Sequence, residues 1–205
     1  MSEEERAAIG KHHADVDQFK LAALVPDEVK VKFETAKNLY LYAWFVYRFY
    51  PVSEHHALTC LELGLRMRFP DPLPKKYWNK PPSRKPTLHP LLRFASESGF
   101  LQNKGFRRWH KHVEQHARQR YVNDILKEMT ERNLDQVELN YEQAIPNEQD
   151  QNWNLLSVLL EVLPEIRNSY AHGSTMLHDR VLGTLELVSE ILNQLFDPIS
   201  DKTTL

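Results

Sequence analysis

The chain has 205 residues, of which 41% are hydrophobic and 26% charged, which is ordinary for a globular protein. Its formal net charge of −2 indicates no partner by itself, so a nucleic-acid site would have to come from a local cluster of cations. The single cysteine, Cys60, excludes an internal disulfide framework and a cysteine-rich zinc site.

The apolar residues follow a helical period along most of the chain, which predicts an all-α fold. Asp27 is placed to cap a long helix, Pro51 to break it, and Ser53 to start the next one. Gly99 closes a shorter helix. The expected helices cover part of 2–24, then 28–50, 53–69, 88–101, 153–172 and 175–196. We therefore expect an antiparallel bundle of about five core helices.

The helix over 28–50 is unusually aromatic near its end. Seven of the twelve residues from Leu39 to Tyr50 are aromatic, and a helix that is apolar all round lies in a core or an interface. Its rings therefore suit core and dimer packing, and the alternative is that they stack on bases. Four histidines on neighbouring segments are expected at the surface: His12, His13, His55 and His56.

Two segments interrupt the expected bundle within a single domain over 1–205: a Pro-rich loop at 70–87 and a charged, mostly helical insertion at 102–152. The insertion starts with cations around one tryptophan: Lys104, Arg107, Arg108, Trp109 and Lys111. One interpretation is a phosphate-binding patch on which Trp109 stacks a base. The other is a helical hairpin in which this basic stretch pairs with the acidic residues of 121–150.

Two weaker patterns lie in the same insertion. His112 and His116 are four residues apart and could chelate zinc, but the sequence offers no evident third ligand, so no metal site is expected. Val137, Leu139 and Tyr141 alternate with polar residues and could form a short strand.

The most distinctive stretch runs from Glu165 to Gly173. Arg167 and His172 are five residues apart, so on one helix they would point roughly 140° from each other. Gly173 predicts a helix end beside His172, where the imidazole can turn towards Arg167. Asn168 and Tyr170 lie between them. A fixed charge, an amide, a phenol and a group that titrates near neutrality suit a phosphate and a proton to be moved beside it.

This Arg-Asn-x-x-x-His pattern, placed before the last helix of an all-α chain, resembles the signature of the HEPN superfamily, and most of all its bacterial stand-alone members. Several HEPN families are metal-independent endoribonucleases. The resemblance therefore implies that His172 is the acid/base and that Arg167 neutralises charge on the phosphate. Asn168 and Tyr170 would orient either group. No metal or other cofactor is expected, and the product would be a cyclic phosphate.

A non-catalytic interpretation stays open. Arg167 could pair with an acid such as Glu161 or Glu165 while His172 caps the helix end. Related domains also serve as nucleic-acid-binding, nucleotide-binding or dimerisation modules. A positive cleft that holds Arg167 and His172 together would favour the nuclease, whereas a buried Arg167–Glu pair would favour the binding module.

The expected partners follow from the same resemblance. HEPN-like domains commonly pair with their motif helices face to face, so we expect a homodimer whose cleft both subunits line. RNA is the expected substrate. If the protein acts in bacterial defence or as a toxin-like nuclease, an inhibitory partner protein could restrain its activity. The acidic N-terminus and the lack of a long apolar run predict a cytoplasmic protein that does not enter a membrane.

Overall fold

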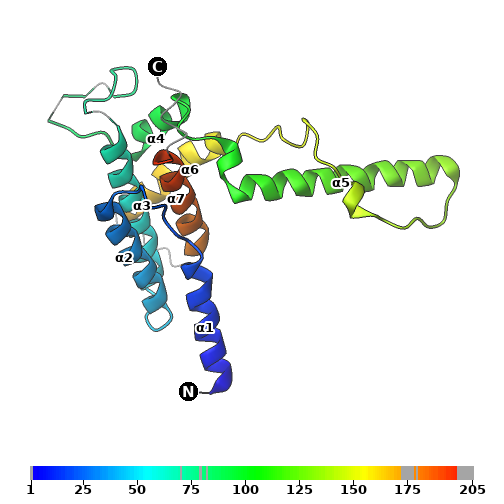
Figure 1. Cartoon of the computed structure of the whole chain (residues 1–205), viewed down its shortest axis with the longest axis horizontal. Helices are drawn as coiled ribbons and strands as arrows, with labels where there is room; N and C mark the ends of the chain where they lie inside the picture. Colours follow the sequence, from blue (N-terminus) through cyan, green and yellow to red (C-terminus); the bar gives the residue numbers. More distant parts are fainter. Residues whose placement is uncertain are drawn as a thin grey trace. The chain divides into compact units, whose positions relative to one another are not determined.

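The computed structural model describes residues 2–69, 71–78, 80–81, 83–171, 178 and 180–197. In these residues all regular secondary structure is helical, which confirms the predicted all-α class (Figure 1). The chain divides into two compact units, Met1–Gln102 with Leu156–Leu205 and Asn103–Leu155. We call them the bundle and the insertion.

Six helices belong to the bundle. They are α1 (Glu3–Asp17), α2 (Asp27–Ala43), α3 (Phe49–Arg68), α4 (Leu88–Glu97), α6 (Leu155–Ala171) and α7 (Val181–Leu195). No helix in the described part of the chain is both long and apolar enough to cross a membrane.

Helix α3 is central to the bundle and packs most extensively on α2 (Figure 1). Near its start the Ser53 hydroxyl donates to the Ala36 carbonyl at 2.7 Å, and two turns later the Cys60 thiol donates to the Val29 carbonyl at 3.2 Å. The later residue on α3 meets the earlier one on α2, so the two helices run antiparallel.

Helix α7 covers another face of α3 and runs in the same direction. The guanidinium of Arg68 donates from Nε to the Leu195 carbonyl at 2.8 Å, so the two helices end together. Between them Gly64 allows a close approach, because a Cβ atom there would lie 2.4 Å from a methyl carbon of Leu192. The absence of a side chain at residue 64 therefore sets the spacing of α3 and α7.

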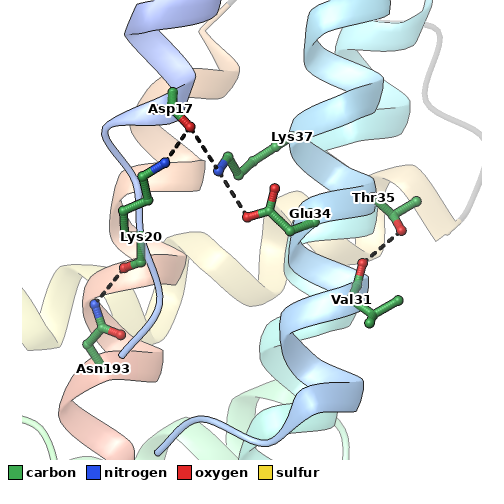
Figure 2. Close-up of polar contacts among 7 residues, drawn as sticks. All are labelled: Asp17, Lys20, Val31, Glu34, Thr35, Lys37 and Asn193. Atoms are coloured by element: carbon green, nitrogen blue, oxygen red, sulfur yellow. Dashed lines mark hydrogen bonds and ion pairs between the residues drawn. The ribbon is translucent and has the colours of Figure 1, made fainter. Parts of the chain in front are cut away.

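Polar contacts fix α1 and the segment after it onto the bundle (Figure 2). The buried amine of Lys37 on α2 lies 3.0 Å from Glu34 and 3.9 Å from Asp17 at the end of α1. Asp17 also pairs with Lys20, whose carbonyl accepts from the side chain of Asn193 on α7 at 3.0 Å. The end of α1 is thereby held against both α2 and α7.

The prediction of one aromatic helix over 28–50 was wrong. Helix α2 ends at Ala43, residues 44–48 form a turn, and α3 begins at Phe49, ahead of the predicted Ser53. Trp, Phe, Val and Tyr are weak helix formers, which favours a turn here. Pro51 lies in the first turn of α3 instead of breaking a helix, because a backbone N–H in the first turn has no partner within the helix. In this turn Phe45 is 71% exposed to solvent.

Three further expectations are settled at single residues. His12 is buried, contrary to prediction: its ring stacks on Tyr40 at 4.3 Å and its Nε2 donates to the Tyr40 carbonyl at 3.0 Å. The last helix begins at Val181 and not at 175, since His178 is already non-helical. Gly99 does adopt the predicted left-handed conformation after α4, with φ 78°.

The insertion contains one long helix, α5 (Arg107–Arg132), with the short 3-10 helices η1 (Asn103–Gly105) and η2 (Tyr141–Gln143). The helical hairpin of the second interpretation is not present, because α5 continues from the basic into the acidic stretch and no second α-helix follows between Arg132 and Asn154. The possible strand at 137–141 does not form either; η2 begins at its last residue.

Candidate functional site

The motif helix α6 is joined to α3 by an ion pair. Nε of Arg167 donates to Oε2 of Glu62 at 3.2 Å. The Glu62 side chain is only 4% exposed, whereas that of Arg167 is 28% exposed. The carboxylate is thus buried, and the guanidinium extends from it towards solvent.

Glu62 is shared between two arginines. Its other oxygen, Oε1, accepts from Nη2 of Arg66 one turn later on α3. Arg66 is itself fixed, because its Nε and Nη2 also donate to the Pro86 carbonyl at 3.3 and 2.9 Å. Two cations around one anion leave a net positive charge. For Arg167 the described contacts use Nε alone, which leaves both terminal nitrogens to face solvent or a ligand.

A second buried acid of α3 binds the next turn of α6. The hydroxyl of Tyr170 donates to Oε2 of Glu54 at 2.5 Å, and Oε1 of Glu54 accepts from the Thr184 hydroxyl on α7. Nε2 of His178, in the segment before α7, lies 2.9 Å from the Tyr170 oxygen and 3.2 Å from Glu54. The Tyr170 hydroxyl donates its proton to Glu54, so its oxygen can only accept from His178. Nε2 of His178 must therefore be protonated, and it donates towards the oxygens of Tyr170 and Glu54.

The environment of Tyr170 favours the protonated phenol even more strongly than water does. Burial, and then the hydrogen bond to Glu54 and the charge of that carboxylate, raise the pKa of the phenol well above its ordinary value of 10.0. The phenol therefore keeps its proton at neutral pH and can donate a hydrogen bond, but it cannot serve as a base.

The predicted site residues differ in how far they are buried, and some of them lie outside the described residues. Arg167 and Tyr170 are half-buried on the α3 side of α6, while Asn168 is exposed. His172, Gly173 and the predicted first residue of the last helix, at 175, lie outside the described residues. Arg167 pairs with Glu62 instead of Glu161 or Glu165 on its own helix.

The sequence interpretation missed both acids of α3 and the histidine before α7. A signal existed for the acids. Glu54 and Glu62 flank the fully buried Leu58 at intervals of four residues, so helical spacing places all three on one face. An acid on an apolar face needs a partner, and a motif that carries an arginine and a tyrosine could supply one. No comparable pattern marks His178.

The candidate nucleic-acid residues all lie in the insertion. Lys104, Arg107, Arg108 and Lys111 are exposed. Trp109 is buried, and its indole nitrogen donates to the Trp153 carbonyl at 3.0 Å, so the prediction of a stacking platform was wrong at this residue. A ring that faces the apolar side of α5 cannot also meet a base.

The second interpretation predicted pairing between the basic and acidic stretches, and one such ion pair forms, between Arg120 and Asp150. Nη2 of Arg120 donates to Oδ2 of Asp150 at 2.8 Å and to the Ile145 carbonyl at 2.8 Å. His112 and His116 lie 4.1 Å apart between ring centres, and the His112 ring also packs against Trp153. Among the described residues no group of three or more metal-ligating side chains comes together.

Comparison with known proteins adds no relative: no family model, no curated protein and no solved structure matches the chain.

Proposed function

We propose that the chain is a metal-independent endoribonuclease whose site lies at the end of α6. A fully buried Arg167–Glu pair would favour the binding module, but here only the acid is buried: Glu62 is 4% exposed and Arg167 is 28% exposed. The observation that carries the proposal is that Glu62 binds this partly exposed arginine through Nε, at 3.2 Å. This contact fixes the plane of the guanidinium and leaves its two terminal nitrogens, which match two phosphate oxygens. Arg66 on the other oxygen of Glu62 keeps the local charge positive.

The proposed reaction is a transesterification with two proton transfers, one from the attacking 2′-hydroxyl and one to the leaving 5′-oxygen. His172 accepts the proton of a ribose 2′-hydroxyl, and the freed oxygen forms a bond to the adjacent phosphorus. The bond from phosphorus to the 5′-oxygen breaks, and that oxygen takes up the proton that His172 accepted, so His172 ends the step as it began. Arg167 stabilises the charge that builds on the phosphoryl oxygens. Tyr170, which retains its proton, orients neighbouring groups instead of accepting a proton.

A second candidate function is a non-catalytic module that binds RNA or nucleotides. The observation that favours it is the same Arg167–Glu62 pair, since an arginine neutralised by a buried acid is the arrangement expected of a structural residue. In this case Arg167 would hold α6 on α3 and any bound phosphate would stay intact.

One experiment separates the two. Purified protein is incubated with tRNA and with total RNA in EDTA, and the ends of any fragments are mapped. The nuclease predicts fragments with cyclic phosphate ends, no cleavage at a 2′-deoxy position, and almost no activity of Arg167→Ala or His172→Ala. Arg6→Ala, at an exposed arginine of α1, is the matched control.

Two outcomes would count against the nuclease. Binding of RNA without cleavage would support the second candidate. Cleavage that EDTA abolishes and zinc restores would reject the metal-independent mechanism.

A further inference from the structure

A groove lies between α5 and η2, inside the insertion. After Asn133 the chain turns back along α5, and η2 packs against this helix (Figure 1). The groove has a volume of about 370 Å³, within the range of about 300–1,000 Å³ that ligand sites occupy. Both elements line it, with Gln115, Arg118, Gln119, Val122 and Tyr141. None of these residues belongs to the Arg167 motif.

Tyr141 gives the groove an exposed aromatic ring. The residue is 51% exposed, and its ring lies edge-on to that of Tyr121, at 6.4 Å between ring centres. The Tyr121 hydroxyl accepts from the backbone N–H of Asn140 at 3.3 Å, and the Asn140 side chain accepts from the backbone N–H of Glu142 at 3.0 Å. These hydrogen bonds hold the residues on either side of Tyr141. A half-exposed ring on a fixed backbone is a surface on which a base can stack.

A line of cations on α5 leads into the groove. At about 100° per residue, Arg107, Lys111 and Arg118 fall within about 40° of one another around the helix. All three are exposed, and at 1.5 Å per residue they extend over about 16 Å of its length. Arg118 lines the groove and forms no ion pair with the described residues. Residues 104–120 hold six cations and one acid, Glu114, so the stretch as a whole is positively charged.

We infer that this groove binds one nucleotide of a single-stranded RNA. Tyr141 stacks the base, Arg118 binds the adjacent phosphate, and the strand continues along the cations towards the start of α5. The amides of Gln115 and Gln119 carry both donors and acceptors, so they can meet any base. The groove therefore binds RNA without a strict sequence preference, as stacking sites on single strands do.

An acidic protein segment is the other ligand that these cations could attract. The ring favours RNA, because a nucleotide presents a phosphate and a flat base together, whereas an anionic peptide has no need of an exposed aromatic group beside the arginine. The choice of RNA rests on the proposed function. The fit of a phosphate and a base to Arg118 and Tyr141 does not depend on cleavage.

The test uses the full chain and a fluorescent single-stranded oligoadenylate of about twelve nucleotides, a length typical of such sites. Each ribose carries a 2′-O-methyl group, so the strand cannot be cleaved, and binding is followed by anisotropy. Tyr141→Leu should weaken binding about fivefold or more, the effect expected from loss of one stacked base. Tyr141→Phe should bind like wild type, because the ring is retained. Tyr47→Leu, at an exposed tyrosine of the turn between α2 and α3, is the matched control and should change nothing.

The phosphate contact is tested at Arg118. Arg118→Ala should weaken binding and reduce the slope of log affinity against log salt by about 0.7, the contribution of one phosphate on a single strand. Arg118→Lys should keep the slope, since the charge is retained. Arg6→Ala, at an exposed arginine of α1, should match wild type.

Three results would overturn the inference. They are no saturable binding at micromolar concentrations, equal affinity of Tyr141→Leu and wild type, and displacement of the strand by polyglutamate as readily as by unlabelled RNA, which would identify an acidic protein as the ligand. Because the strand cannot be cut, this readout is independent of the nuclease assay. Binding that needs Tyr141 in a protein that does not cut RNA would leave the inference standing and reject the nuclease. Cleavage by a protein whose RNA affinity is the same in Tyr141→Leu would do the opposite.

Discussion

Arg167 on α6 and Glu62 on α3 are 105 residues apart in sequence and form an ion pair at 3.2 Å. Glu62→Gln keeps the volume but removes the charge that two guanidiniums share. Both arginines are partly exposed, so the expected loss is about 1–3 kcal/mol of unfolding free energy, below the ~3–5 kcal/mol of a fully buried pair. Urea denaturation followed by circular dichroism measures it. Glu165→Gln, at an exposed glutamate of α6, is the control, and equal stability of the two variants would contradict the role of Glu62.

The shared cleft of the expected homodimer can be tested by mixing inactive Arg167→Ala and His172→Ala proteins under conditions that exchange subunits. If both subunits line one cleft, a mixed dimer retains one arginine and one histidine and recovers part of the RNA cleavage. Sedimentation gives the firmer observation, because a monomer at micromolar concentration would rule out a shared site.

The basic start of α5 should contribute to RNA binding through its charge. Changing Arg107, Arg108 and Lys111 to alanine should weaken binding and reduce the slope of log affinity against log salt by up to about 2, since each phosphate contact on a single strand adds roughly 0.7. The control removes the same charge at three exposed lysines elsewhere, Lys11, Lys75 and Lys127. An unchanged slope with a lower melting temperature would mean that the cations are structural.

Gly64→Ala should destabilise the bundle. The new Cβ would lie 2.4 Å from a methyl carbon of the fully buried Leu192, so the Leu192 side chain would have to shift within the core. We expect a loss of about 1–3 kcal/mol, as for other overpacked cores. Gly10→Ala is the matched control: nothing lies within 4 Å of a Cβ there, so the better helix propensity of alanine should leave stability equal or slightly higher. Thermal melts of the two variants should diverge in opposite directions.

The insertion should be sensitive to acid at Asp150. The hydrogen bond from Arg120, chiefly, lowers the pKa of this carboxyl below its ordinary range. A lowered pKa means that the stabilisation is complete above about pH 4 and is lost as the pH falls through the native value. Unfolding of wild type and Asp150→Asn should therefore differ at neutral pH and converge in acid, with Asp135→Asn as control. A difference that persists at low pH would show that the ion pair is not its source.

The helix class and most helix positions follow from local spacing. Within the predicted helix 53–69, the apolar residues that recur at helical spacing are all buried: Ala57, Cys60, Leu61, Leu65 and Phe69. Periodicity places these residues because a helix repeats over a few positions, whatever it packs against. The same local signal failed from 44 to 48, where no breaker marks the turn that brings α3 back along α2.

The partners of the motif were decided only in three dimensions. The sequence identified Arg167 and Tyr170 as a pair on one helix, but their acids, Glu62 and Glu54, come from a helix more than 100 residues earlier. One interpretation of the sequence likewise placed Trp109 at the surface, because an aromatic residue suits both a core and base stacking. Its burial was decided by the packing of the insertion. Composition and spacing determine which groups a helix can present. Packing determines which of them are buried, and hence which charges remain for a ligand.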